Sequence, residues 1–164
     1  CGKINFLIHS ILLGDLEKIL YYKDNFMKLT TKGRYAVMAM ADLASFSKER
    51  PVSLTEISLR QNISLSYLEQ LFIKLKQKKL VKSIRGSQGG YTLEKPASQI
   101  KLSNIFIAVD EEVRTLNCKK DSKKGCNNKL IKCNAHFLWD KLDQHINSFF
   151  EKTLLEDLIN KRLK

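Results

Sequence analysis

Long apolar runs and acidic residues are both scarce in this chain of 164 residues. No apolar run approaches the ~20 residues that a membrane-spanning helix needs, so we expect no membrane span. There is also no phosphate-binding glycine loop and no pair of side chains placed for acid–base catalysis, so we do not expect an enzyme. Only 17 acids stand against 29 lysines and arginines, which leaves a net charge of +12 at pH 7. Such a chain attracts polyanions, and nucleic acid or an anionic membrane surface is the first partner to consider.

Cysteine is scarce too, but three of the four cysteines lie close together in a lysine-rich stretch. These are Cys118, Cys126 and Cys133, and His136 follows them. An odd group of three beside a histidine, with no secretory signal, favours the reducing cytoplasm and metal ligation over a disulfide framework. Three thiolates and one imidazole match the donor count of one tetrahedral zinc or one small iron–sulfur cluster.

The spacing of these donors leaves the bound group open. Structural zinc sites usually contain a tight pair of cysteines, whereas only Cys133 and His136 are tightly spaced here, with two residues between them. Three residues apart at the start of an expected helix, they can face the same side. From the residues alone, an iron–sulfur cluster, a structural zinc and unliganded redox-active thiols are all open.

Helical periodicity dominates the first half of the chain. The peptide that begins at Met27 resembles a natural start, so we expect residues 1–26 to be an upstream segment and assign them no role. Apolar residues at helical spacing predict a helix over 33–46, which Pro51 separates from the next unit. A second short helix is predicted to begin after Ser53, because Ser53 and Glu56 have the spacing of a capping box. Its candidate buried positions are Leu54, Ile57 and Leu59.

A wing is expected directly after a third helix. Asn62 is the turn before that helix, which is predicted from Ser64 to about Lys79. Residues 80–84 and 91–93 then alternate like strands, and the stretch between them is rich in glycine. Two short helices with a tight turn, followed by a two-stranded wing, are typical of the winged helix-turn-helix that reads DNA.

The third helix and the wing carry the candidate DNA contacts. Lysines can neutralise phosphates, glutamine can bind adenine with two hydrogen bonds, and glutamate accepts from the cytosine amino group but repels phosphate. Glu69 should therefore discriminate between sites more than it adds affinity. Arg85 at the wing tip can reach guanine or a narrow minor groove. The candidates are Ser64, Ser66, Tyr67, Glu69, Gln70, Lys74, Arg85, Gly86 and Gly89. Tyr67 as a core aromatic is the competing interpretation.

The C-terminal part is expected to mediate dimerisation. A helix is predicted over 102–109, a long helix with an apolar stripe follows the cysteines, and a final capped helix begins at Thr153. The stripe consists of Leu138, Leu142, Ile146 and Phe149, and we expect the same helix of a second copy to cover it. Packing within one subunit is the alternative for part of it.

These elements predict a mainly α fold, in which a winged helix-turn-helix with three helices and a two-stranded wing precedes a long C-terminal dimerisation helix. The expected divisions are an upstream segment (1–26), a DNA-binding domain (27–96), a linking helix with the metal-binding loop (97–136) and dimerisation helices (137–164).

Several blocks of sequence carry a resemblance to a known family. They are Leu29-Thr30-Thr31-Lys32-Gly33-Arg34-Tyr35-Ala36-Val37, Ile63-Ser64-Leu65-Ser66-Tyr67-Leu68-Glu69-Gln70-Leu71-Phe72, and Val81 with Arg85-Gly86 and Gly89-Gly90-Tyr91. The similarity continues through Ala108-Val109-Asp110-Glu111 to the cysteines and His136-Phe137-Leu138-Trp139. Over nearly everything after residue 26, the chain resembles the IscR-type iron–sulfur regulators.

The resemblance implies a homodimeric bacterial transcription factor that binds a 2Fe-2S cluster through Cys118, Cys126, Cys133 and His136. It implies binding to a pseudo-palindromic operator in double-stranded DNA, and repression of iron–sulfur biogenesis genes, although the sequence leaves activation open. Two features depart from the family pattern. Ser87-Gln88 stand where the family favours a proline and a further glycine, and the cysteine spacers, 119–125 and 127–132, are longer than usual.

Three other functions are compatible with the residues. A regulator of the same family could respond to nitric oxide or oxidation, and a winged-helix DNA binder could carry structural zinc. An iron–sulfur assembly or electron-transfer protein is the alternative from a different class. It would require reversible redox chemistry at constant occupancy and no preference for DNA.

Overall fold

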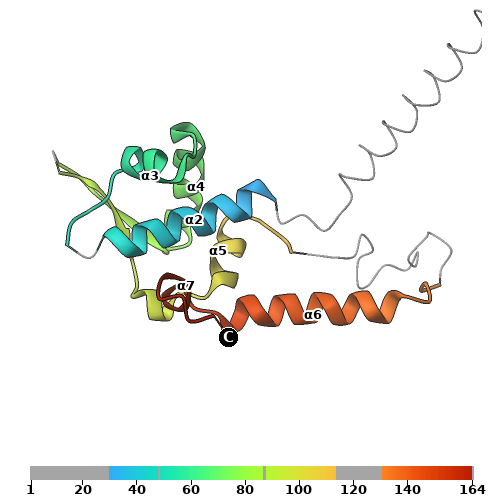
Figure 1. The fold of residues 1–164 in the computed structure, drawn as a ribbon. Coiled ribbons are helices and arrows are strands. Elements are labelled where there is room, and N and C mark those ends of the chain that lie inside the picture. The colour runs from blue at the N-terminus through green and yellow to red at the C-terminus, as the bar shows by residue number, and fades with distance from the viewer. Residues whose placement is uncertain (1–29, 48, 87, 114–130, 164) are drawn as a thin grey trace, which may run out of the picture.

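The computed structural model describes residues 30–47, 49–86, 88–113 and 131–163. Figure 1 shows α3 and α4 on one side of α2, α5 and α7 on the other, and α6 extending away from the rest. The elements are α2 (Thr31–Phe46), α3 (Leu54–Gln61), α4 (Leu65–Gln77), β1 (Val81–Ile84), β2 (Gly90–Leu93), η1 (Ala97–Gln99), α5 (Leu102–Ala108), α6 (His136–Lys152) and α7 (Leu155–Ile159). Within these described ranges, no helix is long and apolar enough to cross a membrane.

Local capping sets where the second helix starts. The backbone N–H of Glu56 donates to Ser53 Oγ at 3.2 Å, and the backbone N–H of Ser53 donates to the Glu56 carboxylate at 2.9 Å. This reciprocal arrangement is the predicted capping box, and α3 begins at Leu54 as expected. Asn62 ends α3 in the left-handed region with φ 52°, which asparagine tolerates better than most residues.

Three details of the sequence-based expectation are wrong. Leu59 is 79% exposed rather than buried. It lies about 200° around the helix from the buried Ile57, so α3 cannot bury both on one face. Helix α4 ends at Gln77, because Lys79 adopts a left-handed conformation with φ 55°. Helix α7 begins at Leu155, since Thr153 directs its hydroxyl back to the Phe149 carbonyl at the end of α6 (2.7 Å) instead of capping α7.

The wing is an antiparallel pair with a backbone connection to the segment before α3. Val81 pairs with Leu93 and Ile84 with Gly90. Val52 extends the sheet by an isolated bridge. Its N–H donates to the Tyr91 carbonyl (3.0 Å), and its carbonyl accepts the Tyr91 N–H (2.8 Å). A Cβ on Gly90 would lie 2.6 Å from the Val52 carbonyl carbon and oxygen, so the close approach requires glycine.

One core joins the helix-turn-helix, the wing and the last helix. Buried apolar residues of α2, α3, α4 and α5 pack together, and Leu155 of α7 is fully buried in the same cluster. Phe72 of α4 and Tyr91 of β2 pack edge to face with ring centroids 4.9 Å apart, which seats the wing on the third helix. The predicted fold class, mainly α with a winged helix-turn-helix and a long helix behind it, is confirmed.

Candidate nucleic-acid interface and cysteine pocket

Helix α4 has one buried face and one open face. Leu68, Leu71, Phe72 and Leu75 are buried. Helical spacing places the exposed side chains roughly opposite them, namely Ser66, Glu69, Gln70, Ile73 and Gln77. At the start of the helix, the exposed Ser64 and Ser66 hydroxyls lie 2.9 Å apart. Four of the predicted DNA contacts therefore lie together on one accessible surface, namely Ser64, Ser66, Glu69 and Gln70.

Two candidate residues on α4 have protein partners instead of facing solvent fully. The half-buried Tyr67 packs edge to face on Tyr35 of α2, with ring centroids 5.8 Å apart. Lys74 Nζ donates to the Asp110 carboxylate at 2.7 Å. Lys74 is therefore on the flank of the open face, four residues after Gln70, with its charge already paired.

The wing tip is exposed and its turn depends on glycine. Arg85 and Gly86 are exposed, and Gly86 adopts φ +125°, which is costly for any other residue. The Gly89 N–H donates to the Gly86 carbonyl at 2.9 Å, and a Cβ at Gly89 would lie 2.5 Å from the Ile84 carbonyl oxygen. Lys76 Nζ of α4 donates to Ser83 Oγ of β1 at 2.7 Å, so the wing is tied to the third helix.

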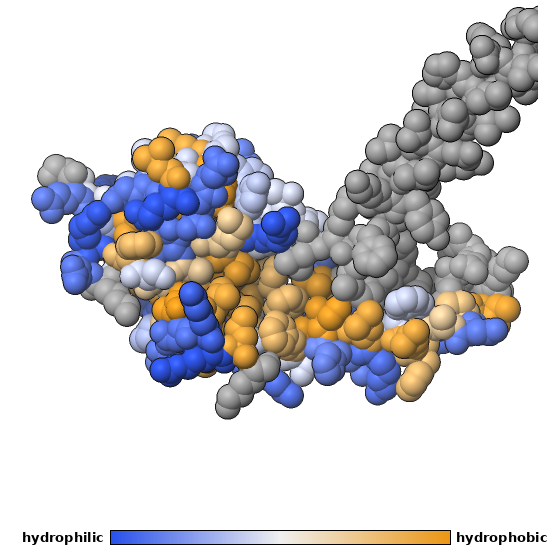
Figure 2. All heavy atoms as spheres, viewed as in Figure 1, coloured by the Kyte–Doolittle hydropathy of each residue, from blue (hydrophilic) through white to orange (hydrophobic). Residues whose placement is uncertain are grey.

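Positive charge lines α4 and the wing. The exposed cations there are Lys76, Lys78, Lys79, Lys82 and Arg85. Figure 2 shows hydrophilic side chains over much of the wing side, in blue. Cations held on rigid elements next to exposed polar side chains are the arrangement that binds phosphates while polar groups contact base edges.

A partly buried ion pair joins α2 to α3. Asp42 exposes none of its side-chain surface, and its carboxylate accepts three hydrogen bonds from the Arg60 guanidinium at 2.7–3.2 Å. Gln61 Nε2 donates a fourth at 2.8 Å. The guanidinium also lies 4.3 Å from the ring centroid of Phe46. This network positions the first helix of the helix-turn-helix relative to the core.

The two acids after α5 join three elements. Glu111 accepts from the Thr30 N–H at 3.2 Å, at the N-terminus of α2. Lys32 donates to the Asp110 carbonyl at 2.8 Å and lies 3.8 Å from the Glu111 carboxylate. The pKa of Asp110 is lowered, first by the hydrogen bond from Lys74 and then by the neighbouring positive charges.

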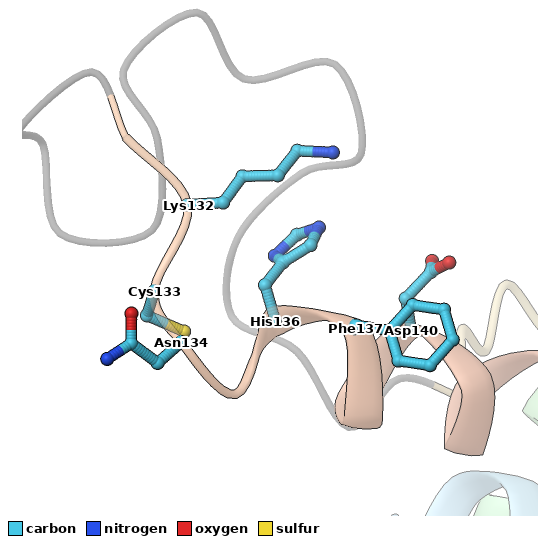
Figure 3. A pocket seen from close by; sticks show the side chains of 6 residues that line it. All are labelled: Lys132, Cys133, Asn134, His136, Phe137 and Asp140. Carbon is cyan, nitrogen blue, oxygen red and sulfur yellow. The ribbon is translucent and has the colours of Figure 1, made fainter.

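Cys133 and His136 line the same pocket at the start of α6. Cys118 and Cys126 lie outside the described residues. Cys133 is half-buried, and its carbonyl accepts the His136 N–H at 2.9 Å. The pocket has a volume of about 520 Å³, and Lys132, Asn134, Phe137 and Asp140 complete its lining. Figure 3 shows the His136 imidazole and the Lys132 ammonium on the same side of it.

Half of the predicted donor set therefore faces one cavity large enough for a small metal group. A thiol and an imidazole are donors that suit iron or zinc, so these residues fit such a group. The described parts of the chain contain no group of three or more potential ligands that could hold an ion without the remaining cysteines.

The apolar stripe of α6 is largely uncovered. Leu138 is 60% and Phe149 39% exposed, while Leu142 and Ile146 are half-buried. Figure 2 shows hydrophobic side chains, in orange, gathered along α6. The C-terminal end of α6 is anchored: Phe150 packs on Phe106 of α5 with centroids 4.6 Å apart.

A polar clamp supports that anchor. Glu151 pairs with Lys101 and accepts from Ser103 at 2.7 Å, and these contacts lower its pKa, the hydrogen bond from Lys101 first. The remainder of α6 extends from this point (Figure 1).

Sequence reasoning missed two acidic residues near these sites. Asp110 entered only as part of the family resemblance, and nothing local indicates that it contacts Lys74, 36 residues earlier. Asp140 lies four residues after His136, so helical spacing could have placed it beside the pocket.

A helix-turn-helix, a basic wing seated on the second helix of that motif, and exposed polar residues on α4 define a winged-helix DNA-binding regulator. The sequence profile of Rrf2, described as an iron-dependent transcriptional regulator, matches residues 29–161. The chain belongs to the Rrf2 family of transcriptional regulators, is of the IscR type and is not an enzyme.

Named relatives and solved structures agree with this assignment. The chain is 48% identical over 134 residues to the HTH-type transcriptional regulator IscR of Photorhabdus laumondii, covering 82% of this chain and 80% of that protein. The structure of T. potens IscR superposes with a TM-score of 0.66 at 36% identity, covering 84% of this chain and 89% of the other. CymR, the global cysteine regulator of B. subtilis, superposes with a TM-score of 0.69 at 32% identity, covering 83% and 98%.

Proposed function

We propose that this regulator is a homodimeric repressor whose operator binding is modulated by a 2Fe-2S cluster held by Cys118, Cys126, Cys133 and His136. Its targets are the genes of iron–sulfur cluster biogenesis, and it acts on chromosomal DNA in the cytoplasm. The observation that carries the proposal is the pocket at the start of α6, into which both Cys133 and His136 face. The match to a family of iron-dependent regulators supports it.

The donor set suits a cluster that can be lost and regained. Two protein donors are needed for each iron, and three thiolates with one imidazole supply that number. When bound, the cluster supplies an iron centre, and the fraction of protein that holds it would depend on the supply of iron and sulfide and on oxidants. Because a protonatable imidazole is a weaker anchor than a fourth thiolate, His136 favours a sensor over a permanent electron carrier.

The four donors come from two places in the chain. Cys133 lies just before α6 and His136 is its first residue, whereas Cys118 follows α5 in sequence. Holding them together ties the start of the long helix to the segment that leaves α5. A ligand can shift an equilibrium only if it binds one arrangement better, so this tie is the proposed means of changing the placement of the DNA-reading heads.

For DNA reading, we assign the major groove to the open face of α4 and the backbone or minor groove to the wing. Ser64, Ser66, Tyr67, Glu69 and Gln70 lie at the N-terminal half of α4, the part of a recognition helix that meets base edges. The wing tip, made by Arg85, Gly86 and Gly89, has the exposure and the close backbone turn that phosphate contact requires.

Dimerisation through α6 is the part of the proposal that supplies two reading heads. A second copy that packs on the stripe of Leu138, Leu142, Ile146 and Phe149 would remove its exposed apolar surface from water. Two heads about one DNA turn (~34 Å) apart read a pseudo-palindrome. Leu138→Lys should weaken the dimer in analytical ultracentrifugation. The matched control Gln144→Lys places the same charge on the exposed opposite side of α6 and should not.

The first experiment is anaerobic purification with visible absorption spectra and iron, sulfide and zinc analysis. We expect a coloured protein with equal iron and sulfide, and loss of both in Cys133→Ser. Cys1→Ser is the matched control, because Cys1 is the cysteine outside the proposed donor set, and this variant should keep the colour. A colourless protein with one zinc per chain would refute the cluster and leave a DNA-binding regulator with a structural zinc site.

The second experiment compares apo and holo protein on operators selected in vitro from random duplexes. Fluorescence anisotropy should show that the two forms differ in affinity or in site preference. Equal affinities for every operator would refute cluster control. Reversible reduction at constant iron content without any DNA preference would instead favour the electron-transfer alternative.

A further inference from the structure

The recognition helix presents a lysine whose charge is already neutralised. Lys74 lies in α4, four residues after Gln70, on the flank of the open face. Its ammonium donates to the Asp110 carboxylate at 2.7 Å, and the two side chains are 40% and 71% exposed. A phosphate that approaches this flank therefore meets a carboxylate together with the cation. Lys74 can bind DNA at full strength only if Asp110 withdraws.

Asp110 is held in place by its backbone. It adopts a left-handed conformation with φ 53°, directly after the end of α5. Lys32 donates to its carbonyl at 2.8 Å. The next residue, Glu111, accepts from the Thr30 N–H at 3.2 Å, and its side chain is only 5% exposed. The carboxylate of Asp110 is thus aimed at α4 by contacts with the N-terminus of α2.

The side chain of Glu111 is closely packed against α2 and α5. A Cβ on Gly33 would lie 2.9 Å from a ring carbon of Phe106 and 3.1 Å from Glu111 Cγ. The backbone of α2 therefore lies directly against α5 and the acid that follows it. Any displacement of the 110–113 segment has to break the contacts of Glu111 with Thr30 and Lys32 as well as the Lys74 pair.

The position of Asp110 in the chain connects it with the cysteines. Residues 110–113 are the last described before Cys118. Of the other proposed donors, Cys133 lies three residues before α6 and His136 is the first residue of that helix. Because residues 114–132 connect the two segments in sequence, a change in how the donors are held would act on both ends of that stretch. The end nearer α5 is the segment that carries Asp110.

We propose that Asp110 weakens DNA binding, because it withholds Lys74 from the DNA backbone and does so to an extent set by the occupancy of the cysteine site. The second half of this inference rests on the function proposed above. The first half depends only on the ion pair and on α4 as the reading helix.

The test uses Asp110→Asn in the full chain, in apo and holo forms, on an operator selected in vitro with the wild-type protein. Asparagine tolerates the left-handed conformation as aspartate does, so the backbone at 110 is preserved. Binding is measured by anisotropy over a range of salt concentrations. Freeing one lysine for a phosphate should steepen the salt dependence by ~0.9 in slope for each bound chain. We expect operator affinity to rise by roughly 2–5-fold per chain, the range of an exposed ion pair.

Two further variants isolate the pair. In a Lys74→Gln background, Asp110→Asn should change neither the slope nor the affinity, because no cation is left to release. Glu151→Gln removes the same charge from another exposed ion pair, with Lys101 at the junction of α5 and α6, and should leave the slope unchanged. An equal slope in Asp110→Asn and wild type, or an effect that persists without Lys74, would overturn the proposal.

The apo–holo comparison separates this proposal from the proposed function. The ratio of apo to holo affinity should shrink in Asp110→Asn, because the paired and released states of Lys74 no longer differ. A wild-type ratio that Asp110→Asn leaves intact would refute the role of Asp110 alone. Equal apo and holo affinities in the wild type would refute cluster control, while the salt slopes would still test the ion pair.

Discussion

Removing the Arg60 guanidinium should destabilise the protein far more than removing a neighbouring arginine. In Arg60→Ala, the Asp42 carboxylate keeps only the hydrogen bond from Gln61 and loses three from Arg60. Because Asp42 exposes no side-chain surface, water cannot replace them without opening the contact between α2 and α3.

The expected loss follows from the environment of each partner. Stranding one charge of a buried pair costs ~3–5 kcal/mol. The Arg60 side chain is 30% exposed, so the lower end applies. Loss of the cation–π contact with Phe46 adds ~0.5–1 kcal/mol. We therefore expect a total of ~3–4 kcal/mol in the free energy of unfolding.

Arg50→Ala is the matched control. Arg50 also pairs with an acid, Glu56, at 2.5 Å, but its side chain is 62% exposed. Because water screens an exposed pair of this kind, its loss should cost far less than the loss of Arg60. Urea unfolding followed by circular dichroism, at one fixed protein concentration because association affects stability, measures both variants.

A third variant tests the cause of the loss. Adding Asp42→Ala to Arg60→Ala removes the stranded charge and should recover part of the stability. Two results would show that the buried carboxylate is not the source of the effect. One is that Arg60→Ala costs no more than Arg50→Ala. The other is that adding Asp42→Ala lowers the stability of Arg60→Ala further, by as much as Asp42→Ala lowers the stability of the wild type.

Three further outcomes are expected. Gly90→Ala should cost ~2–5 kcal/mol by pushing the wing off the Val52 backbone and breaking its two hydrogen bonds, and operator affinity should fall with it; unchanged urea midpoints would contradict the close approach. Hydrogen bonds lower the pKa of Glu56 from 4.5 to about 2, and the largest contribution is the one from the Arg50 side chain. The stabilising contribution of the ionised Glu56 is therefore complete above pH 4.5 and is lost as the pH falls towards 2. The stability of Glu56→Gln should depend less on pH between these values; an unchanged pH dependence would contradict this. Arg85→Ala and Gln70→Ala should each weaken operator binding by ~1–3 kcal/mol and relax sequence preference, whereas Arg162→Ala beyond α7 should do neither in competition anisotropy.

The start of α3 and the wing turn were predictable because short-range contacts decide them. Ser53 and Glu56 are three residues apart and complete their capping box without help from the rest of the chain. Gly86 and Gly89 allow the wing turn for a similar reason, since their own backbone geometry excludes a side chain. The order of these local features along the chain therefore predicted the winged helix-turn-helix.

The errors lie where a pattern has to be matched to a particular neighbour. Leu59 fits an apolar pattern, but the core contacts only the face of α3 that carries Ile57. Threonine is a common helix N-cap residue, yet the Thr153 hydroxyl donates to the Phe149 carbonyl at the end of the preceding helix. Composition alone does not decide whether this hydroxyl accepts from the next helix or donates to the preceding one.

The sequence by itself determined the class of protein, the closeness of Cys133 to His136, and the positive charge along the third helix and the wing, because each depends on residue type and local spacing. Only the tertiary structure decided which charges meet. Asp42 and Arg60 are 18 residues apart, and Lys74 and Asp110 are 36 apart. No local periodicity encodes such pairs, because they form only when packing of the apolar faces brings α2 to α3 and α5 to α4.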